Sequence, residues 1–535
     1  MKLYFNGPIL TMNDRMPQAE TVLEDHGRIL FAGKKDDAER MAGGFAEHID
    51  LNGRTLMPAF LDAHSHITDA AGSIRTADLR DAGSFDEILS IMKEYAAKQD
   101  STERGDFLIG QGYDHNNLKE GRHPDKTILD DAFPDVPVVL FHVSLHMCTV
   151  NSRMLERIGI DDSSKNPEGG VIGRLEETDE PNGYFEETAM LPVYRVAMKT
   201  MMPDLKDLQQ AQLLYLENGI LTAQNGAGNK VNIALLRKAA EQGRLIPDVV
   251  AYPCFAAGSD PHRMFRENED YTGPYNGRFR IGGYKVILDG SPQGRSAWMS
   301  EPYENSGDFR SYGRMTDEEL QACVDLAYRE ARQILAHCNG DAASEQFLNA
   351  CERAEKKYPG RSREIRPVMI HCQTVRDDQL DRMAELGMIA SIFVDHVYYW
   401  GDVHLKNFGE KRGNHISPVR AALDRGIPVN FHTDCPVIRP NLFQTVWTAV
   451  NRITKSGCLL GQDQRVSVPE ALHAVTTGAA YLYGEEKEKG SLEAGKRADF
   501  ILADKNPLET DPMKLREIRV TECIREGQTV WTRSE

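Results

Sequence analysis

Metal-binding types of side chain follow apolar runs at four places in the chain. His64 and His66 follow TLMPAFLDA, and residues i and i+2 of a β-strand face the same side, so both imidazoles could reach one ion. Further along, His337 ends RQILA, His371 ends RPVMI, and Asp434 follows PVNFHT. Imidazole and carboxylate donors without thiolates suit a divalent metal, above all Zn²⁺, with manganese, iron and cobalt as alternatives. The pattern predicts a metal site with one or two ions.

A strand that stops on His or Asp at its carboxyl end is typical of a (β/α)₈ barrel, which presents catalytic groups at that face. Apolar runs also alternate with amphipathic helical stretches, as parallel strands with outer helices require. We therefore predict an α/β fold with a TIM-type barrel over 58–488. The predicted barrel strands lie at 56–64, 219–225, 248–255, 280–288, 332–337, 365–371, 388–394 and 428–433.

The predicted barrel is longer than the roughly 250 residues of a plain one. The excess lies after the first strand, and we expect residues of about 70–215 to form an inserted lid or cap. Short strand patterns and turns fill both chain ends, with hairpins at Asp25-His26-Gly27 and Glu526-Gly527. Neither end has a core of its own, so we expect 1–57 and 489–535 to build one small β-sandwich domain together.

The composition of the chain indicates which classes of binding partner to expect. The 535 residues carry 63 Lys and Arg against 81 Asp and Glu, a net charge of −18, which gives no electrostatic reason to bind nucleic acid or anionic lipid. No apolar run approaches the roughly 18 residues of a membrane helix, and the first residues do not read as a secretion signal. We expect a cytoplasmic protein with a small-molecule substrate; the sequence leaves a homodimer open.

The nine cysteines are scattered and form no CxxC pair, so neither a disulfide framework nor a thiolate zinc site is expected. Cys338, Cys372 and Cys435 each follow a proposed ligand by one residue. Strand alternation points them away from the ligands, which predicts a packing role.

The order of His-x-His, His, His and Asp along the strands resembles the amidohydrolase superfamily of metal-dependent hydrolases. Within it, the chain is similar to the YtcJ-like branch, which includes N-substituted formamide deformylases. The matching segments cover nearly the whole length: MPAFLDAHSH (57–66), GYDHNN (112–117), HMCTVNS (146–152), NGYFEE (182–187), YKVILDGSPQGRSA (284–297), AHCNGDAA (336–343), IHCQ (370–373), TDCPV (433–437), TAVNRIT (448–454) and GSLEAGKRADFILAD (490–504).

The resemblance implies a binuclear site. His64 and His66 would hold one metal and His337 and His371 the second. Lys285 would bridge them after CO₂ converts its amine to a carbamate, as in some members of the superfamily. The alternative is a mononuclear enzyme in which Lys285 pairs with Asp289 or another acid.

In the mechanism that the resemblance implies, a metal-activated hydroxide attacks an amide-type C–N bond other than a peptide bond, of an N-acyl, N-formyl or cyclic amide. Asp434 would bind metal and serve as general acid and base. Two alternatives stay open: a deaminase-type or other C–X hydrolysis at the same site, and a catalytically silent regulatory or binding homologue.

Candidate substrate-binding residues flank the predicted strands. His146, Tyr113, Asp114 and His115 lie in the insertion and could close over the substrate; the alternative is a structural role. Arg295 and Trp298 follow the fourth strand, and His396 follows the seventh. One departure from the family pattern is His432, where relatives usually carry a small residue, and its bulk could alter the pocket.

Overall fold

The computed structural model describes residues 1–98, 107–144, 147–167, 169–176, 178–256 and 259–534. The chain divides into two compact units: Met1–Ile67 together with Gln212–Glu535, and Thr68–Ala211. Within the described ranges, no helix combines the length and apolar character that crossing a bilayer requires.

The centre of the first unit is built from parallel strands. One sheet has the order β17-β16-β15-β8 and another the order β18-β19-β20-β21-β22, and all neighbouring strands in both run parallel. A parallel bridge between Cys254 and Lys285 joins the two sheets after β16. The strands are β8 (Phe60–Leu61), β15 (Ile220–Gly228), β16 (Asp248–Pro253), β17 (Phe279–Ile281), β18 (Gly283–Ile287), β19 (Gln333–Cys338), β20 (Val368–His371), β21 (Ile389–Ile392) and β22 (Val429–Phe431).

Two predicted strands are divided. The run 56–64 was expected as one strand, but β7 (Thr55–Pro58) pairs with a strand from the C-terminal end while β8 pairs with β15. The chain passes between the sheets after Pro58: the N–H of Ala59 donates to the carbonyl of Asp499, and the N–H of Phe60 donates to that of Gly219. His64 and His66 lie beyond β8 and are not strand residues. The prediction that they face the same side because they alternate along one strand was therefore wrong in its premise. The run 280–288 likewise separates into β17 and β18 around Gly282.

Helices separate the parallel strands along the chain, as the sequence predicts. Helix α10 begins with a capping box between Thr316 and Glu319 and buries an apolar face that includes Leu320 and Val324. The helices of this unit are α1 (Lys35–Ala42), α8 (Lys230–Glu241), α9 (Pro261–Glu267), α10 (Asp317–Arg329), α11 (Asp341–Lys357), α12 (Arg361–Ile365), α13 (Asp377–Leu386), α14 (His396–Asn414), α15 (Val419–Asp424), α16 (Leu442–Asn451), α17 (Val468–Ala474) and α18 (Thr477–Leu482).

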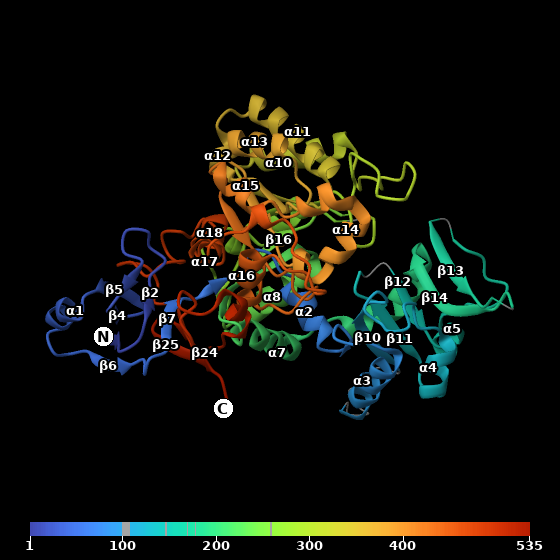
Figure 1. Ribbon diagram of the computed structural model, residues 1–535, viewed down its shortest axis with the longest axis horizontal. Coiled ribbons are helices and arrows are strands. Elements are labelled where there is room, and N and C mark those ends of the chain that lie inside the picture. The colour runs from blue at the N-terminus through green and yellow to red at the C-terminus, as the bar shows by residue number, and fades with distance from the viewer. Residues whose placement is uncertain (99–106, 145–146, 168, 177, 257–258, 535) are drawn as a thin grey trace. The chain divides into compact units, whose positions relative to one another are not determined.

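Both chain ends contribute to one sheet, with the order β25-β24-β23-β7-β2-β3 (Figure 1). A second sheet has the order β5-β4-β1-β6. The two expected hairpins, β4–β5 and β24–β25, both form. Apolar side chains from both ends, such as Tyr4, Val22, Phe500 and Ile524, share one buried cluster, so neither end is complete alone. The strands are β1 (Lys2–Phe5), β2 (Ile9–Leu10), β3 (Gln18–Ala19), β4 (Thr21–Asp25), β5 (Arg28–Gly33), β6 (Glu47–Asp50), β23 (Phe500–Ala503), β24 (Val520–Arg525) and β25 (Gln528–Thr532).

The second unit has its own sheet, with the order β13-β14-β12-β11-β10-β9, and its own buried clusters. Strands β9, β10 and β11 run parallel. The pairs β11–β12, β12–β14 and β14–β13 are antiparallel. The strands are β9 (Ala77–Asp78), β10 (Leu108–Tyr113), β11 (Val138–His142), β12 (Met147–Val150), β13 (Gly170–Arg174) and β14 (Pro181–Glu187). The helices are α3 (Phe85–Lys98), α4 (Lys126–Ala132), α5 (Ser152–Ile158) and α6 (Leu191–Met201), while α2 (Ile67–Ser73) and α7 (Leu205–Leu216) span its borders. The predicted role of this region as a lid stays a prediction.

Candidate metal centre

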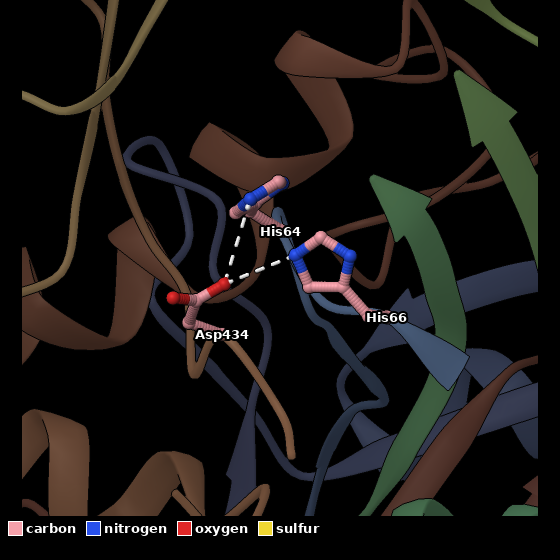
Figure 2. A group of neighbouring side chains, drawn as sticks. All are labelled: His64, His66 and Asp434. Carbon is pink, nitrogen blue, oxygen red and sulfur yellow. Dashed lines mark ion pairs between the residues drawn. The ribbon is translucent and has the colours of Figure 1, made fainter. Parts of the chain in front are cut away.

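His64, His66 and Asp434 point toward one another in the first unit (Figure 2). Oδ1 of Asp434 lies 3.5 Å from Nε2 of His64 and 3.3 Å from Nε2 of His66. The backbone N–H of Asp434 donates to the carbonyl of His64, which ties the segment after β22 to the segment after β8. Residues 370 positions apart in the sequence thus present three metal-binding atoms to one point.

Gln224, in the middle of β15, fixes the orientation of the His64 ring. Its Nε2 donates to the carbonyl of Ala63, so its Oε1 faces Nδ1 of His64 at 2.6 Å and accepts a hydrogen bond from it. The proton therefore sits on Nδ1, and Nε2 keeps a lone pair directed at the carboxylate. A Cβ at position 226 would overlap the same ring, so Gly226 is required by close approach.

The electrostatics of this triad favour a cation. Burial, reinforced by the charge of Lys285, lowers the pKa of His64 well below its ordinary value, so the ring is neutral. Burial raises the pKa of Asp434, but the bond to His66 outweighs it and leaves the pKa below its usual range. A lone pair and an anionic oxygen that face each other repel unless a positive charge lies beside them. The Lys285 amine, 3.4 Å from Nε2 of His64, supplies one when it is protonated, and a metal ion would supply a larger one.

Lys285 lies on β18 within reach of the triad. Its Nζ is 3.4 Å from Nε2 of His64, and the residue is 1% exposed. Burial lowers the pKa of the amine to about 8, so a substantial neutral fraction exists near neutral pH. Asp289, which the sequence offered as an alternative partner of Lys285, contacts His337 instead.

His337 is held by a buried carboxylate. Oδ1 of Asp289 lies 3.0 Å from Nδ1 of His337, while the backbone N–H groups of Gly340 and Trp298 donate to its other oxygen. This carboxylate–histidine pair directs Nε2 away from Asp289, as pairs behind metal-bound histidines do. The ring centroid of His371 lies 4.5 Å from that of His337, so the two predicted ligands of a second ion are neighbours.

His371 and Asp434 occupy strained backbone conformations, with φ of 70° and 55°. Left-handed φ values in residues other than glycine cluster at functional sites because surrounding structure must hold them. His432 joins this cluster: its Nε2 lies 3.4 Å from Nδ1 of His371, and its Nδ1 lies 3.0 Å from Oγ of Ser391. From the sequence, His432 was identified only as a bulky residue where the family pattern has a small one. In the structure it is fully buried among the candidate ligands.

Gln224 and the contact of Asp289 with His337 were not predicted from the sequence. The only sign of Gln224 is a polar side chain inside an apolar strand, a pattern too common to single it out. Asp289 was noticed, but as a partner of the wrong side chain, because spacing along a strand cannot tell which neighbouring strand a carboxylate faces.

The predicted substrate-binding residues are placed unequally. His396, the first residue of α14, is buried, and its ring centroid lies 6.0 Å from that of His371. Trp298 is half-buried, and Nε of Arg295 donates to Asn407, which favours a structural role for that arginine. Tyr113 and Asp114 lie in the second unit, and His146 lies outside the described residues. Substrate contact stays a prediction for all of them.

The three cysteines beside the candidate ligands are buried and unbridged. Burial raises the pKa of Cys372 to about 12 and that of Cys338 well above its ordinary value, so both stay neutral thiols. The packing role of these cysteines stays a prediction.

Comparisons with known proteins place the chain among the amidohydrolases. The model of the amidohydrolase family matches residues 47–531. The chain is 26% identical to the YtcJ protein of Bacillus subtilis (strain 168), covering 99% of both chains, and 26% identical to N-substituted formamide deformylase of Arthrobacter pascens, covering 98% of this chain and 97% of that one. The crystal structure of an uncharacterized metal-dependent hydrolase from Pyrococcus furiosus aligns with a TM-score of 0.73 at 27% identity, over 95% of this chain and 100% of that one.

Proposed function

This chain belongs to the amidohydrolase family, and from that premise we propose that it hydrolyses an amide-type C–N bond of a small molecule. The substrate class is an N-acyl, N-formyl or cyclic amide. The observation that carries the proposal is the convergence of His64, His66 and Asp434 at distances that a shared cation would explain. The deformylase relative, named for the hydrolysis of a substituted formamide, supports the choice of bond.

The strand order supports a closed (β/α)₈ barrel as the scaffold. Neighbouring strands are parallel from β8 to β17 and from β18 to β22. The Cys254–Lys285 bridge spans one gap between the sheets, and the N–H of Thr433 donates to the carboxylate of Asp62 across the other. In a barrel of this kind the carboxyl ends of all strands meet at one face, which would bring the candidate ligands together.

The donor set fits two divalent ions, with zinc as the first choice. His64, His66 and Asp434 would hold one, and His337 and His371 the second. Lys285 would bridge them as a carbamate: the lone pair of the neutral amine forms a bond to the carbon of CO₂, and one proton leaves the nitrogen. The buried position of Lys285 and its lowered pKa favour that reaction. Metal bound there would lower the pKa of a water from 15.7 to about 7 and polarise the scissile carbonyl.

Asp434 is the group best placed to move protons. Its carboxylate is ionised and has two oxygens. Oδ1 faces the two imidazoles and would face the metal, which leaves the second oxygen to accept a proton from the attacking water. That oxygen would then return the proton to the leaving nitrogen, which would depart as an amine. Gln224 and Asp289 hold the rings of His64 and His337 throughout, so their lone pairs keep one direction.

The experiment is metal analysis of protein purified without chelators, followed by a screen of N-formyl, N-acyl and cyclic amides. We expect at least one metal per chain and hydrolysis of one amide class that depends on it. Substitution of Asp434 by Asn should abolish turnover on the same substrate. A chain that binds no metal even after zinc and bicarbonate are added would overturn the proposal. Turnover only on ring amidines would favour the deaminase alternative.

A further inference from the structure

A second group of metal-binding side chains lies in the unit Thr68–Ala211, at the carboxyl ends of two parallel strands. Strand β10 ends at Tyr113, directly before Asp114 and His115, and β11 ends on His142. Tyr113 and His142 are paired across the ladder, so the three side chains leave the sheet at one edge. The register shifts at Gly112, which has a φ of 97°, and this bulge turns the end of β10 toward that of β11.

The spacing of the three donor atoms matches a metal coordination sphere. Nδ1 of His115 lies 3.1 Å from Nε2 of His142, and Oδ1 of Asp114 lies 3.9 Å and 3.7 Å from those two nitrogens. The nearest point equidistant from the three atoms lies in their plane, about 2.1 Å from each, which is the length of zinc bonds to histidine nitrogen and carboxylate oxygen. A tetrahedral ion lies out of that plane, so the two longer separations, those to Asp114, would have to shorten on binding.

The burial of Asp114 and His142 and the negative charge of Asp114 also favour a bound cation. Asp114 is 7% exposed and His142 is 4% exposed. Within the described ranges, no Lys or Arg pairs with the Asp114 carboxylate, whose neighbours are histidines and asparagine amides. The positive charge that compensates this buried carboxylate must come from a bound cation or from a protonated imidazole of His142, whose Nε2 lies 3.7 Å from Oδ1.

Neighbouring groups hold the two imidazoles in place. The ring of His123 stacks on that of His115 at a centroid distance of 4.0 Å, and the Tyr113 hydroxyl lies 3.1 Å from Nδ1 of His123. Oγ of Ser144 lies 2.8 Å from Nδ1 of His142 and can accept a hydrogen bond from it once Nε2 binds an ion. That arrangement requires the backbone N–H of Ser144, which donates to the same Nδ1 at 3.1 Å, to turn away. The competing arrangement is a hydrogen-bonded network without metal, in which Nδ1 keeps accepting from that N–H and Nε2–H donates to His115.

We propose that Asp114, His115 and His142 bind one divalent transition-metal ion of the zinc class, with its fourth position open to water or a small ligand. Three protein ligands with an open position distinguish this site from closed structural zinc sites, which use four. The ion would supply the charge that compensates the buried carboxylate. This proposal is independent of the hydrolytic function, because its residues and its test differ from those of the barrel ligands.

The test uses the full chain, stripped of metal, reloaded with Zn²⁺ and freed of excess ion before elemental analysis. The double variant His115→Ala/His142→Ala should hold one zinc ion fewer per chain than the wild type. The control His26→Ala/His48→Ala, which removes exposed histidines, should match the wild type. Equal zinc in the wild type and the His115→Ala/His142→Ala variant would overturn the proposal and favour the hydrogen-bonded network.

Two further measurements guard against misfolding and against confusion with the barrel ligands. Anomalous diffraction at the zinc edge from wild-type crystals should show a peak between Asp114 and His142; a difference map with peaks elsewhere only would overturn the proposal. The variant His64→Ala/His66→Ala should keep this ion while it loses metal from the barrel ligands. Loss of hydrolysis with retention of the peak would separate failure of the proposed function from failure of this inference.

Discussion

Two groups of metal-binding side chains gather at the ends of parallel strands, but they draw on different numbers of strands. We call His64, His66, Lys285, His337, His371 and Asp434 the His64 site, and Asp114, His115 and His142 the His115 site. In both, the His and Asp residues lie at or beyond the carboxyl ends of parallel strands, and Lys285 of the His64 site lies within β18. The His64 site draws on strands or following segments at β8, β18, β19, β20 and β22, whereas the His115 site draws on β10 and β11 alone.

The difference teaches what separates a binding site from a reactive one. The His64 site adds a buried lysine, a carboxylate that can move protons, and two residues with left-handed φ. The His115 site has one carboxylate, and that carboxylate is already engaged by asparagine amides. Both groups offer the donors of a metal site, but of the two only the His64 site has the additional groups that the proposed hydrolysis would need.

The largest expected effect is at Asp434. Asp434→Asn should keep most of the bound metal but lower kcat by about 10²–10⁴-fold, because general acid–base catalysis contributes that much and an amide cannot carry the proton. Steady-state kinetics together with elemental analysis checks this. Asp424→Asn, at an exposed carboxylate paired with Arg420, is the matched control. If Asp434→Asn had the kcat of the wild type, Asp434 would not be the proton carrier, and this difference between the two sites would be refuted.

Lys285→Met should come next. The change removes the amine that would bridge two ions, so bound metal should fall from two per chain toward one and activity by about 100-fold or more, above the usual loss for an outer-shell contact. Reloading stripped wild-type protein with zinc should be promoted by bicarbonate, and reloading of the variant should not. A variant with two metals per chain would show that the lysine has no bridging role.

Gln224→Met tests the positioning of His64. The substitution removes the oxygen that accepts the Nδ1 proton, and we expect metal affinity at the His64 site to weaken by about 10–100-fold. Gln224→Glu retains an acceptor and should restore much of the affinity. Competition with a chromophoric chelator gives both constants. Unchanged affinity in Gln224→Met would mean that the ring is held by other contacts.

The smallest effect should come from Cys372→Ala. If the thiol beside His371 only packs, the metal content and kcat of the variant should stay within about twofold of the wild type, with a loss of stability typical of a small buried cavity. Elemental analysis and thermal unfolding measure the two quantities. A lost metal equivalent would place sulfur among the ligands of the His64 site.

Much of the framework could be predicted from local sequence patterns. The runs that become β15, β16, β19, β20, β21 and β22 are apolar and end in turn or ligand residues, so their positions were expected within a few residues. The hairpins at Gly27 and Gly527 follow from turn chemistry that involves neighbouring residues only. The prediction failed where one apolar run served two sheets, as at Pro58, because hydrophobicity does not specify a partner.

The donor residues of the candidate site could be predicted from the sequence, whereas the residues that contact those donors could not. His64, His66 and Asp434 could be singled out because each follows an apolar run, and the structure brings them together. In the inserted unit, Asp114 and His115 were noticed but His142 was not, although it too ends an apolar run, because the strand-end pattern was sought only along the predicted barrel strands. Its partner strand had to be known before it could be grouped with them.

The sequence by itself determined which chemical groups are available and at which ends of which strands they lie, because residue identity and strand polarity are local properties. The tertiary structure decided which nitrogen of His64 keeps its lone pair, which carboxylate holds His337, and how far burial lowers the pKa of Lys285. Those properties depend on side chains that are distant in the chain, such as Gln224, and on exclusion of water. Folding alone brings such groups within a few ångströms of each other.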